Sequence, residues 1–275
     1  MKWLRWLLLP MAGLTYLFAQ RCELFESVIP SSVPNPLDLT PSLAVDAPAG
    51  PARARAAATR VIPLLEPELT AKELQWGDPV FLRAFKEEAT LELFIKHRQS
   101  GRFVLFRSYP IAKQSGTLGP KLREGDGQVP EGFYAAGRSA MKPNSTYHLA
   151  VNIGYPNALD QALKRTGSFI MIHGNQVSIG CLAMTDEKIE EIYSLCDAAL
   201  QQGQSFFRIH IFPFRMQDDR LEREKTHLHY DFWQNLQEGY RLFETHGVPA
   251  ETQVQNHRYQ FQALLPEGTE SAPAK

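Results

Sequence analysis

Cysteine is scarce in this sequence, with three residues in 275, and neither sign of charge predominates. A domain of this length can fold around its own hydrophobic core, and three cysteines do not make a disulfide framework. The formal net charge of −1 excludes the broad basic surface with which many proteins bind nucleic acid. The sequence also has no phosphate-binding glycine loop, dinucleotide fingerprint or zinc-finger spacing. We therefore expect no nucleic-acid partner, no metal and no other cofactor.

A hydrophobic run of 14 residues, 6–19, lies near the N-terminus and follows Lys2 and Arg5. A basic start followed by a run of this length is typical of a signal peptide and is short for a membrane-spanning helix. A signal-peptide cleavage site usually has a small residue at its first position, whereas Leu17 at that position is large. The pattern predicts that residues 1–26 are a signal peptide or an uncleaved membrane anchor, and that the rest of the chain is exported.

The next segment, residues 27–77, is rich in proline and alanine. Such a composition buries little apolar surface, so we expect an extended linker. An arm packed on the surface of the folded domain is the alternative. The folded domain is predicted over residues 78–262, and a disordered tail over residues 263–275.

Short hydrophobic segments separated by glycine- and proline-containing turns fill residues 78–262. They predict strands over residues 80–85, 90–96, 102–109, 148–153, 168–173 and 206–212. One helix is expected after Thr185 as N-cap, with Cys196 on its buried face, and another over residues 231–246, closed by Gly247. The predicted fold class is α+β, mostly β, with a few helices.

The most informative segment of the chain is residues 168–181. An apolar run ends in His173 and Gly174, and Ser178, Gly180 and Cys181 follow in the pattern Ser-x-Gly-Cys. A cysteine thiol becomes an effective nucleophile when a histidine within hydrogen-bond reach can take its proton. Papain-like proteases place the cysteine more than a hundred residues before the histidine, whereas here the histidine precedes the cysteine by eight residues. The spacing therefore indicates a different class of cysteine enzyme.

This motif and the blocks around it resemble the YkuD-type L,D-transpeptidase catalytic domain, and the YafK-like branch of that family in particular. The resemblance extends from about residue 79 to residue 261 and includes Ser108-Tyr109-Pro110, Leu118-Gly119-Pro120-Lys121, Pro130-Glu131-Gly132-Phe133-Tyr134, Asn152-Ile153-Gly154-Tyr155-Pro156-Asn157 and Phe212-Pro213-Phe214-Arg215. It implies a β-sandwich-type catalytic domain over residues 78–262.

The resemblance also implies roles for the residues of the motif. Cys181 is the nucleophile and His173 the base, while the backbone carbonyl of Gly174 orients the imidazole. The hydroxyl of Ser178 makes a hydrogen bond near the site. The backbone N–H groups of Gly180 and Cys181 are the expected donors to the oxyanion.

Two positions depart from the usual pattern of the family. Ile179 stands where most members have a second histidine, and Ala183 stands where most have an arginine. A missing arginine removes a binding group for a substrate carboxylate. Lys113 and Lys121 are the preferred substitutes, and Arg138 and Arg215 are further candidates.

Three functions follow from the resemblance. The first is a cysteine L,D-transpeptidase that attacks an L,D-bond of a peptidoglycan stem peptide and passes the acyl group to an amine of another stem peptide or of an outer-membrane lipoprotein. The second is a hydrolase (an amidase) that uses the same cysteine to cut a peptide or lipoprotein link to peptidoglycan. The third is a peptidoglycan-binding protein without catalysis. All three place the protein in the periplasm, with anchoring to the inner membrane as one possibility.

Overall fold

The computed structural model describes residues 49–266 of the chain. The predicted signal peptide or anchor and the first part of the predicted linker lie outside the described residues, and so do residues 267–275 of the predicted tail. Among the residues that the structure describes, no helix combines the length and the hydrophobicity needed to cross a membrane.

A five-stranded sheet forms the centre of this part of the chain. Its order is β3 (Phe103–Pro110), β2 (Thr90–Lys96), β1 (Val80–Phe85), β9 (Phe206–Phe212) and β4 (Gly132–Gly137). Neighbouring strands are antiparallel except β1 and β9, which run parallel. Side chains alternate between the two faces of a strand, and β9 follows this rule: Ile209 and Ile211 belong to one buried cluster, whereas His210 and Phe212 point to the other face. The sheet therefore separates two layers of hydrophobic core.

A smaller sheet carries the segment singled out by the sequence. It contains β5 (Met141–Lys142), β6 (Ala150–Asn152), β7 (Met171–His173) and β8 (Leu182–Ala183) in that order. A 3-10 turn (Arg138–Ala140) precedes it, and α2 (Ala158–Ala162) lies between β6 and β7 in the chain. Residues of both sheets share one buried cluster, in which Val151 and Ile172 of the small sheet accompany Leu82 and Leu93 of the large one. The short strands that carry the motif are thus fixed to the main core.

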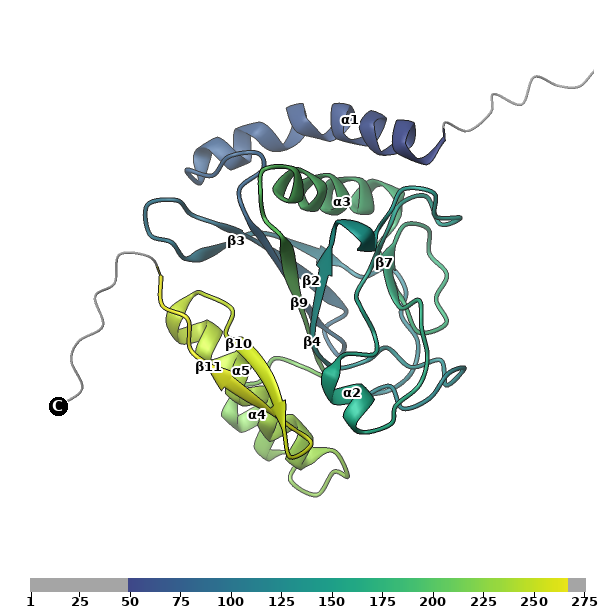
Figure 1. The fold of residues 1–275 in the computed structure, drawn as a ribbon, viewed down its shortest axis with the longest axis vertical. Helices are drawn as coiled ribbons and strands as arrows, with labels where there is room; N and C mark the ends of the chain where they lie inside the picture. The colour runs from purple at the N-terminus through teal and green to yellow at the C-terminus, as the bar shows by residue number, and fades with distance from the viewer. Residues whose placement is uncertain (1–48, 267–275) are drawn as a thin grey trace, which may run out of the picture. The chain divides into compact units, whose positions relative to one another are not determined.

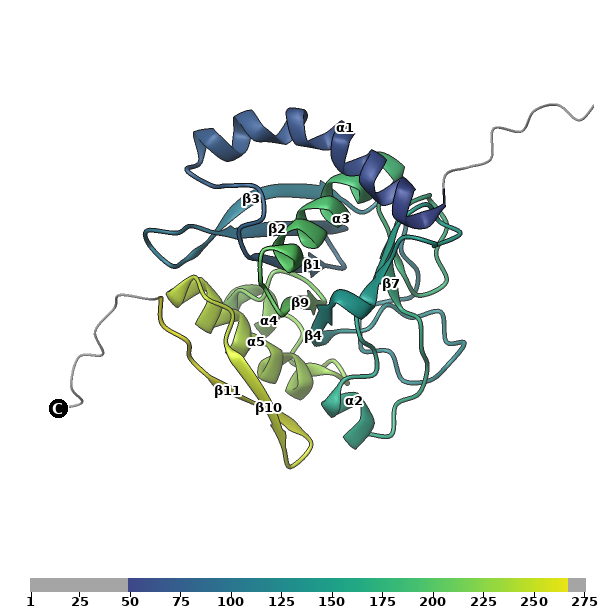
Figure 2. The same ribbon diagram turned by 45° about the horizontal axis from the view of Figure 1, so that its top comes forward.

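Two helices, α1 (Gly50–Ala71) and α3 (Asp186–Gln201), pack against each other on one side of the five-stranded sheet (Figures 1 and 2). α1 buries Ala57, Val61, Leu65 and Leu69, a four-residue spacing that places one face of the helix in the core. The prediction of an extended linker is therefore wrong for residues 50–71, and the alternative of a packed arm is the one observed. Two prolines inside α1, Pro63 and Pro67, lie on its exposed face, so the composition that suggested a linker does not prevent burial of the opposite face.

The other side of the sheet is covered by α4 (Asp218–Glu222), α5 (Tyr230–His246) and the hairpin of β10 (Glu251–Gln255) and β11 (Arg258–Gln262) (Figure 1). α5 supplies Trp233, Leu236 and Tyr240 to the buried cluster on this side, which also contains Phe85 and Phe212 of the sheet. The last regular element ends at residue 262, where the sequence places the end of the folded domain.

The predicted elements agree with the structure in type and in place. Strands β1, β2 and β9 have the predicted bounds, while β6 and β7 are shorter than the predicted strands. Thr185 occupies the N-cap position of α3 without a side-chain capping bond, and Cys196 is fully buried on that helix. Eleven strands and five α-helices occur within residues 49–266, which confirms the α+β class with strands as the more numerous elements.

Candidate active site

Short strands of the small sheet carry the predicted catalytic residues. β7 runs antiparallel to β6 and parallel to β8, with His173 opposite Ala183. Parallel neighbours usually need a crossover of a dozen or more residues, but the loop between β7 and β8 has eight. Positive φ angles at Asn175 (62°) and Gly180 (106°) turn it back sharply. The loop therefore delivers Cys181 alongside the start of β7, two positions along the strand from His173.

The imidazole of His173 is oriented by the next residue's backbone. His173 is 2% exposed, and its Nδ1 lies 2.5 Å from the carbonyl oxygen of Gly174. A carbonyl oxygen only accepts hydrogen bonds, so Nδ1 carries the hydrogen and Nε2 keeps its lone pair. Burial lowers the pKa of His173, against the bond to Gly174, which raises it. The neutral imidazole, with Nε2 as a proton acceptor, is therefore the favoured form at neutral pH.

Residue 174 sits where three segments meet. A Cβ added to Gly174 would lie 2.5 Å from Oδ1 of Asp186 and 2.8 Å from the carbonyl oxygen of Tyr147. The same Asp186 oxygen accepts the N–H of Asn175 at 2.7 Å, and the ring of Tyr147 stacks on the imidazole of His173 with centroids 4.7 Å apart. Only glycine leaves room for this approach, which holds the histidine loop between the first turn of α3 and residue 147.

The thiol of Cys181 is half-buried at the edge of β7. Its Sγ accepts the backbone N–H of Met171 at 3.4 Å and lies 3.7 Å from the carbonyl oxygen of Phe169. Burial raises the pKa of Cys181, against the N–H of Met171 and the charge of Lys121, which lower it. Within residues 49–266 the thiol and the imidazole of His173 make no direct hydrogen bond. Burial thus favours the neutral forms of both groups, a thiol and an imidazole, over an ion pair at rest.

The backbone amides before the thiol are already hydrogen-bonded. The N–H of Cys181 donates to Oγ of Ser178 at 3.0 Å, and the N–H of Gly180 donates to Oγ of Ser115 at 2.7 Å. The two amides predicted as oxyanion donors are therefore occupied by serine hydroxyls in this structure. The physical reason is the tight loop, because the φ of 106° at Gly180 turns both N–H groups toward serine hydroxyls of the protein itself.

Of the two lysines predicted to bind substrate, Lys121 is already committed elsewhere. Its ammonium is buried and donates to Oδ1 of Asp126 at 2.6 Å and to the carbonyl oxygen of Arg123 at 2.9 Å. It is therefore not a free cation for a substrate carboxylate, and it acts on the site through its charge near Cys181. The second, Lys113, pairs through its backbone with Ala183, and its side chain is exposed beside β8.

The further candidate cations are engaged in ion pairs away from the motif. Arg138 lies 3.7 Å from Asp197, and Arg215 lies 2.8 Å from Glu92. At the two positions that depart from the family pattern, Ala183 is fully buried in the β7–β8 ladder and Ile179 is 85% exposed. Lys113 is thus the candidate whose backbone touches the strand where the arginine is missing.

Several residues of the site carry no signal in the sequence. Ser115, Tyr147 and Asp186 reach the motif from separate segments, and none belongs to a recognisable pattern. A pocket of about 470 Å³ next to the histidine loop is lined by Arg53, Ala56, Arg60, Thr146, His148, Asn175 and Asp186. Two of its arginines come from α1, the segment predicted to be a linker. In the part of the chain that is described, no group of three or more potential ligands is arranged to hold a metal ion.

Comparison with known proteins assigns this arrangement to a class. Residues 97–225 match the model of the L,D-transpeptidase catalytic domain, YkuD. The chain belongs to this family. The Escherichia coli (strain K12) protein named "Putative L,D-transpeptidase YafK" is 46% identical to it over 188 residues, which make up 68% of this chain and 76% of the relative. The YkuD-type, YafK-like prediction is confirmed.

Two solved structures are also similar to parts of the chain. The helical cell shape determining protein Pgp2 from Campylobacter jejuni matches with a TM-score of 0.38 and 21% identity, over 54% of each chain. Bd1075 from Bdellovibrio bacteriovorus matches with a TM-score of 0.34 and 17% identity, over 65% of this chain and 78% of the other. This chain therefore spans about half the length of the Pgp2 structure.

Membership of the family supports an enzyme of the L,D-transpeptidase kind and implies peptidoglycan as its substrate.

Proposed function

We propose that this protein modifies peptidoglycan in the periplasm as a cysteine enzyme, with Cys181 as nucleophile and His173 as general base. The observation that carries the proposal is the bond from Nδ1 of His173 to the carbonyl oxygen of Gly174. It leaves Nε2 as the proton acceptor on a strand whose first residue, Met171, touches the sulfur of Cys181. Nucleophilic catalysis requires a proton acceptor within reach of the thiol, and the placing of His173 two positions along the strand from Met171, which contacts Cys181, supports that role.

The proposed reaction begins with two neutral groups. His173 takes the thiol proton as Sγ of Cys181 attacks the carbonyl carbon of the L-centre in the stem-peptide bond. The C–N bond then breaks, the imidazolium returns the proton to the leaving amine, and a thioester remains on the sulfur. In the second step His173 takes a proton from the incoming amine or water, which forms the new bond to the acyl carbon and releases the thiol.

The nature of the second step distinguishes two candidate reactions. Transfer to an amine gives a cross-linked stem peptide or an attached lipoprotein, whereas water gives hydrolysis of such a link. Hydrolysis is favoured by Ala183, which is buried and uncharged where most family members have an arginine. Without that cation the site has one group fewer with which to bind the carboxylate of an acceptor, and water needs no such group.

The experiment uses the full-length protein and peptidoglycan that carries covalently attached lipoprotein, with mass spectrometry of the soluble products. New cross-links or exchanged amines indicate transfer, and free shortened stems with released lipoprotein indicate hydrolysis. Cys181→Ala abolishes either product, whereas the matched control Cys196→Ala, a buried cysteine of α3, retains it. Equal product from wild type and Cys181→Ala contradicts the proposal, and no product from either favours a binding protein.

A further inference from the structure

His210 is a buried polar residue that the proposed reaction does not use. It lies on β9 between β1 and β4, opposite Arg83 and Phe133, and is 1% exposed. Neither of its ring nitrogens has a hydrogen-bond partner among the described residues. Leaving a buried polar group without a hydrogen bond destabilises the folded state, and most such groups in folded proteins are bonded to protein or water. The unpaired nitrogens of His210 therefore mark a place where a ligand or water can supply the missing hydrogen bonds.

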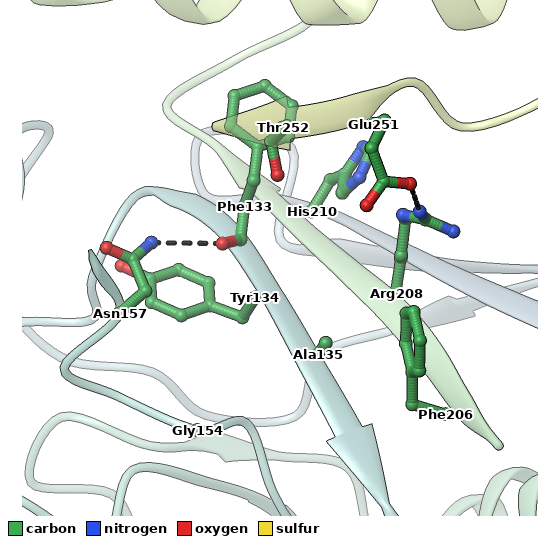
Figure 3. Close-up of a pocket in the computed structure, with 10 residues that line it drawn as sticks. All are labelled: Phe133, Tyr134, Ala135, Gly154, Asn157, Phe206, Arg208, His210, Glu251 and Thr252. Atoms are coloured by element: carbon green, nitrogen blue, oxygen red, sulfur yellow. Dashed lines mark hydrogen bonds and ion pairs between the residues drawn. The ribbon is translucent and has the colours of Figure 1, made fainter. Parts of the chain in front are cut away.

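A cavity of about 320 Å³ adjoins His210 on the side of the C-terminal hairpin (Figure 3). It lies between β4 and β9 of the large sheet and β10, and it is separate from the pocket beside the histidine loop. β10 lies outside residues 97–225, which match the family model. The cavity is lined by Phe133, Tyr134, Ala135, Gly154, Asn157, Phe206, Arg208, His210, Glu251 and Thr252.

The charges of the cavity balance each other. Arg208 forms an ion pair with Glu251 across the two sheets, and their side chains are 22% and 47% exposed. Partly exposed ion pairs contribute little to stability, so this one can open at little cost. Burial lowers the pKa of His210 well below its ordinary value, so the ring is neutral, with one N–H donor and one acceptor nitrogen. A lining with no net charge favours an uncharged ligand that both donates and accepts hydrogen bonds.

Part of the remaining wall of the cavity is aromatic. Phe133 meets the ring of His210 edge to face with centroids 4.6 Å apart, and Phe206 is 44% exposed. A pyranose sugar matches this mixture, because its hydroxyl groups each donate and accept while its C–H face is apolar. Phe206 offers the apolar contact. His210 offers polar contacts, and so do Arg208 and Glu251 once the ion pair between those two residues opens.

The cavity is connected to the candidate active site through one strand pair. Asn152 of β6 pairs with Met171 of β7, the residue whose N–H bonds the sulfur of Cys181. Two residues after Asn152, Gly154 lines the cavity. A glycan strand bound at the cavity would therefore contact the segment that follows β6, the strand paired with β7 beside Cys181.

We propose that this cavity is a second binding site that takes a neutral N-acetylhexosamine unit of the glycan strand, with His210 as the buried polar group of its lining. The proposal rests on the proposed function, since it assumes that the polymer acted on at Cys181 is peptidoglycan. Binding at this cavity would hold the glycan strand in place while the stem peptide reacts.

The test measures binding of a peptide-free disaccharide of N-acetylglucosamine and N-acetylmuramic acid to the full-length Cys181→Ala protein by NMR titration. To keep the probe neutral, the lactyl carboxyl is converted to an amide. His210→Phe keeps a planar ring but removes both unpaired nitrogens. We expect it to weaken binding at least tenfold and to leave the melting temperature unchanged or higher. A purely structural role predicts a lower melting temperature and no effect on sugar binding.

A second variant guards against misfolding of His210→Phe. Thr252→Trp fills the cavity from the partly exposed hairpin and should also abolish binding. The proposal is overturned if the Cys181→Ala protein does not bind the disaccharide, or if both cavity variants bind it as tightly as that parent protein does. The probe carries no peptide, so the two proposals can fail separately. If the disaccharide does not bind but stem peptides are released normally, only the second binding site is contradicted. If the disaccharide binds but no stem peptide reacts, only the proposed reaction is contradicted.

Discussion

The hydroxyl of Ser178 joins both backbone groups of Cys181, accepting its N–H at 3.0 Å and donating to its carbonyl oxygen at 2.6 Å. This pair of bonds closes the loop that returns from β7 to β8. The serine of the Ser-x-Gly-Cys pattern therefore holds the position of the thiol, and its hydroxyl has no hydrogen left to donate to a substrate while that bond is in place.

Replacing Ser178 with alanine should lower kcat strongly and the free energy of unfolding only modestly. The two bonds contribute about 0.5–1.5 kcal/mol each, and a displaced nucleophile loses reactivity even where substrate still binds. We expect kcat to fall about tenfold or more, with KM little changed, in steady-state release of stem peptide. Ser168→Ala, at an exposed position of the same segment, is the control and should behave as wild type. Equal kcat for Ser178→Ala and wild type would show that Cys181 needs no such support.

The rate should have a bell-shaped pH dependence with a wide plateau. The reactive pair is a neutral imidazole and a protonated thiol, so the acid limb reports His173 and the basic limb reports Cys181. Burial lowers the pKa of His173 and raises that of Cys181. The midpoint of the acid limb should therefore lie below the ordinary histidine value of about 6.5, and that of the basic limb above the ordinary cysteine value of about 8.5. Measurement of kcat/KM between pH 5 and 10 tests this expectation.

Alkylation of the thiol distinguishes this neutral pair from a preformed ion pair. Iodoacetamide reacts with the thiolate, so modification of Cys181 should rise with pH and reach half its maximum above the ordinary thiol value. Intact-protein mass spectrometry with Cys181→Ala as reference isolates the modification at this residue. Rapid alkylation already below pH 6.5, lost in His173→Ala, would mean that a thiolate–imidazolium pair exists at rest.

Helix α1 should contribute substantially to stability although it looks like a linker. Leu65 is fully buried, whereas its neighbour Leu64 is 66% exposed. Leu65→Ala leaves a cavity between α1 and the core and should lower the free energy of unfolding by about 2–5 kcal/mol. Leu64→Ala, the matched control, should change it by less than about 0.5 kcal/mol. Urea denaturation followed by circular dichroism measures both, and equal effects would show that α1 does not pack as described.

The strands of the large sheet could be predicted because their pattern is local. Segments such as Val80–Phe85 and Phe206–Phe212 are short, apolar and bounded by turn residues, and burial on both faces of the sheet requires that composition. Helix α1 could not be predicted in the same way. Pro63 and Pro67 lower its intrinsic helix propensity and obscure the four-residue spacing of Val61, Leu65 and Leu69, whose contact with the core compensates for the two prolines.

The sequence by itself determined which chemical groups the candidate site contains. The thiol, the imidazole and the glycines all lie within residues 173–181, and their spacing fits one short return between two strands. Only the tertiary structure decided what those groups can do. It brought Ser115, Tyr147 and Asp186 from distant segments to the loop. It also turned Lys121 from an expected ligand into a buried ion-pair partner. Hydrogen bonds and burial act over a few ångströms in space, and the chain separates those partners by many residues.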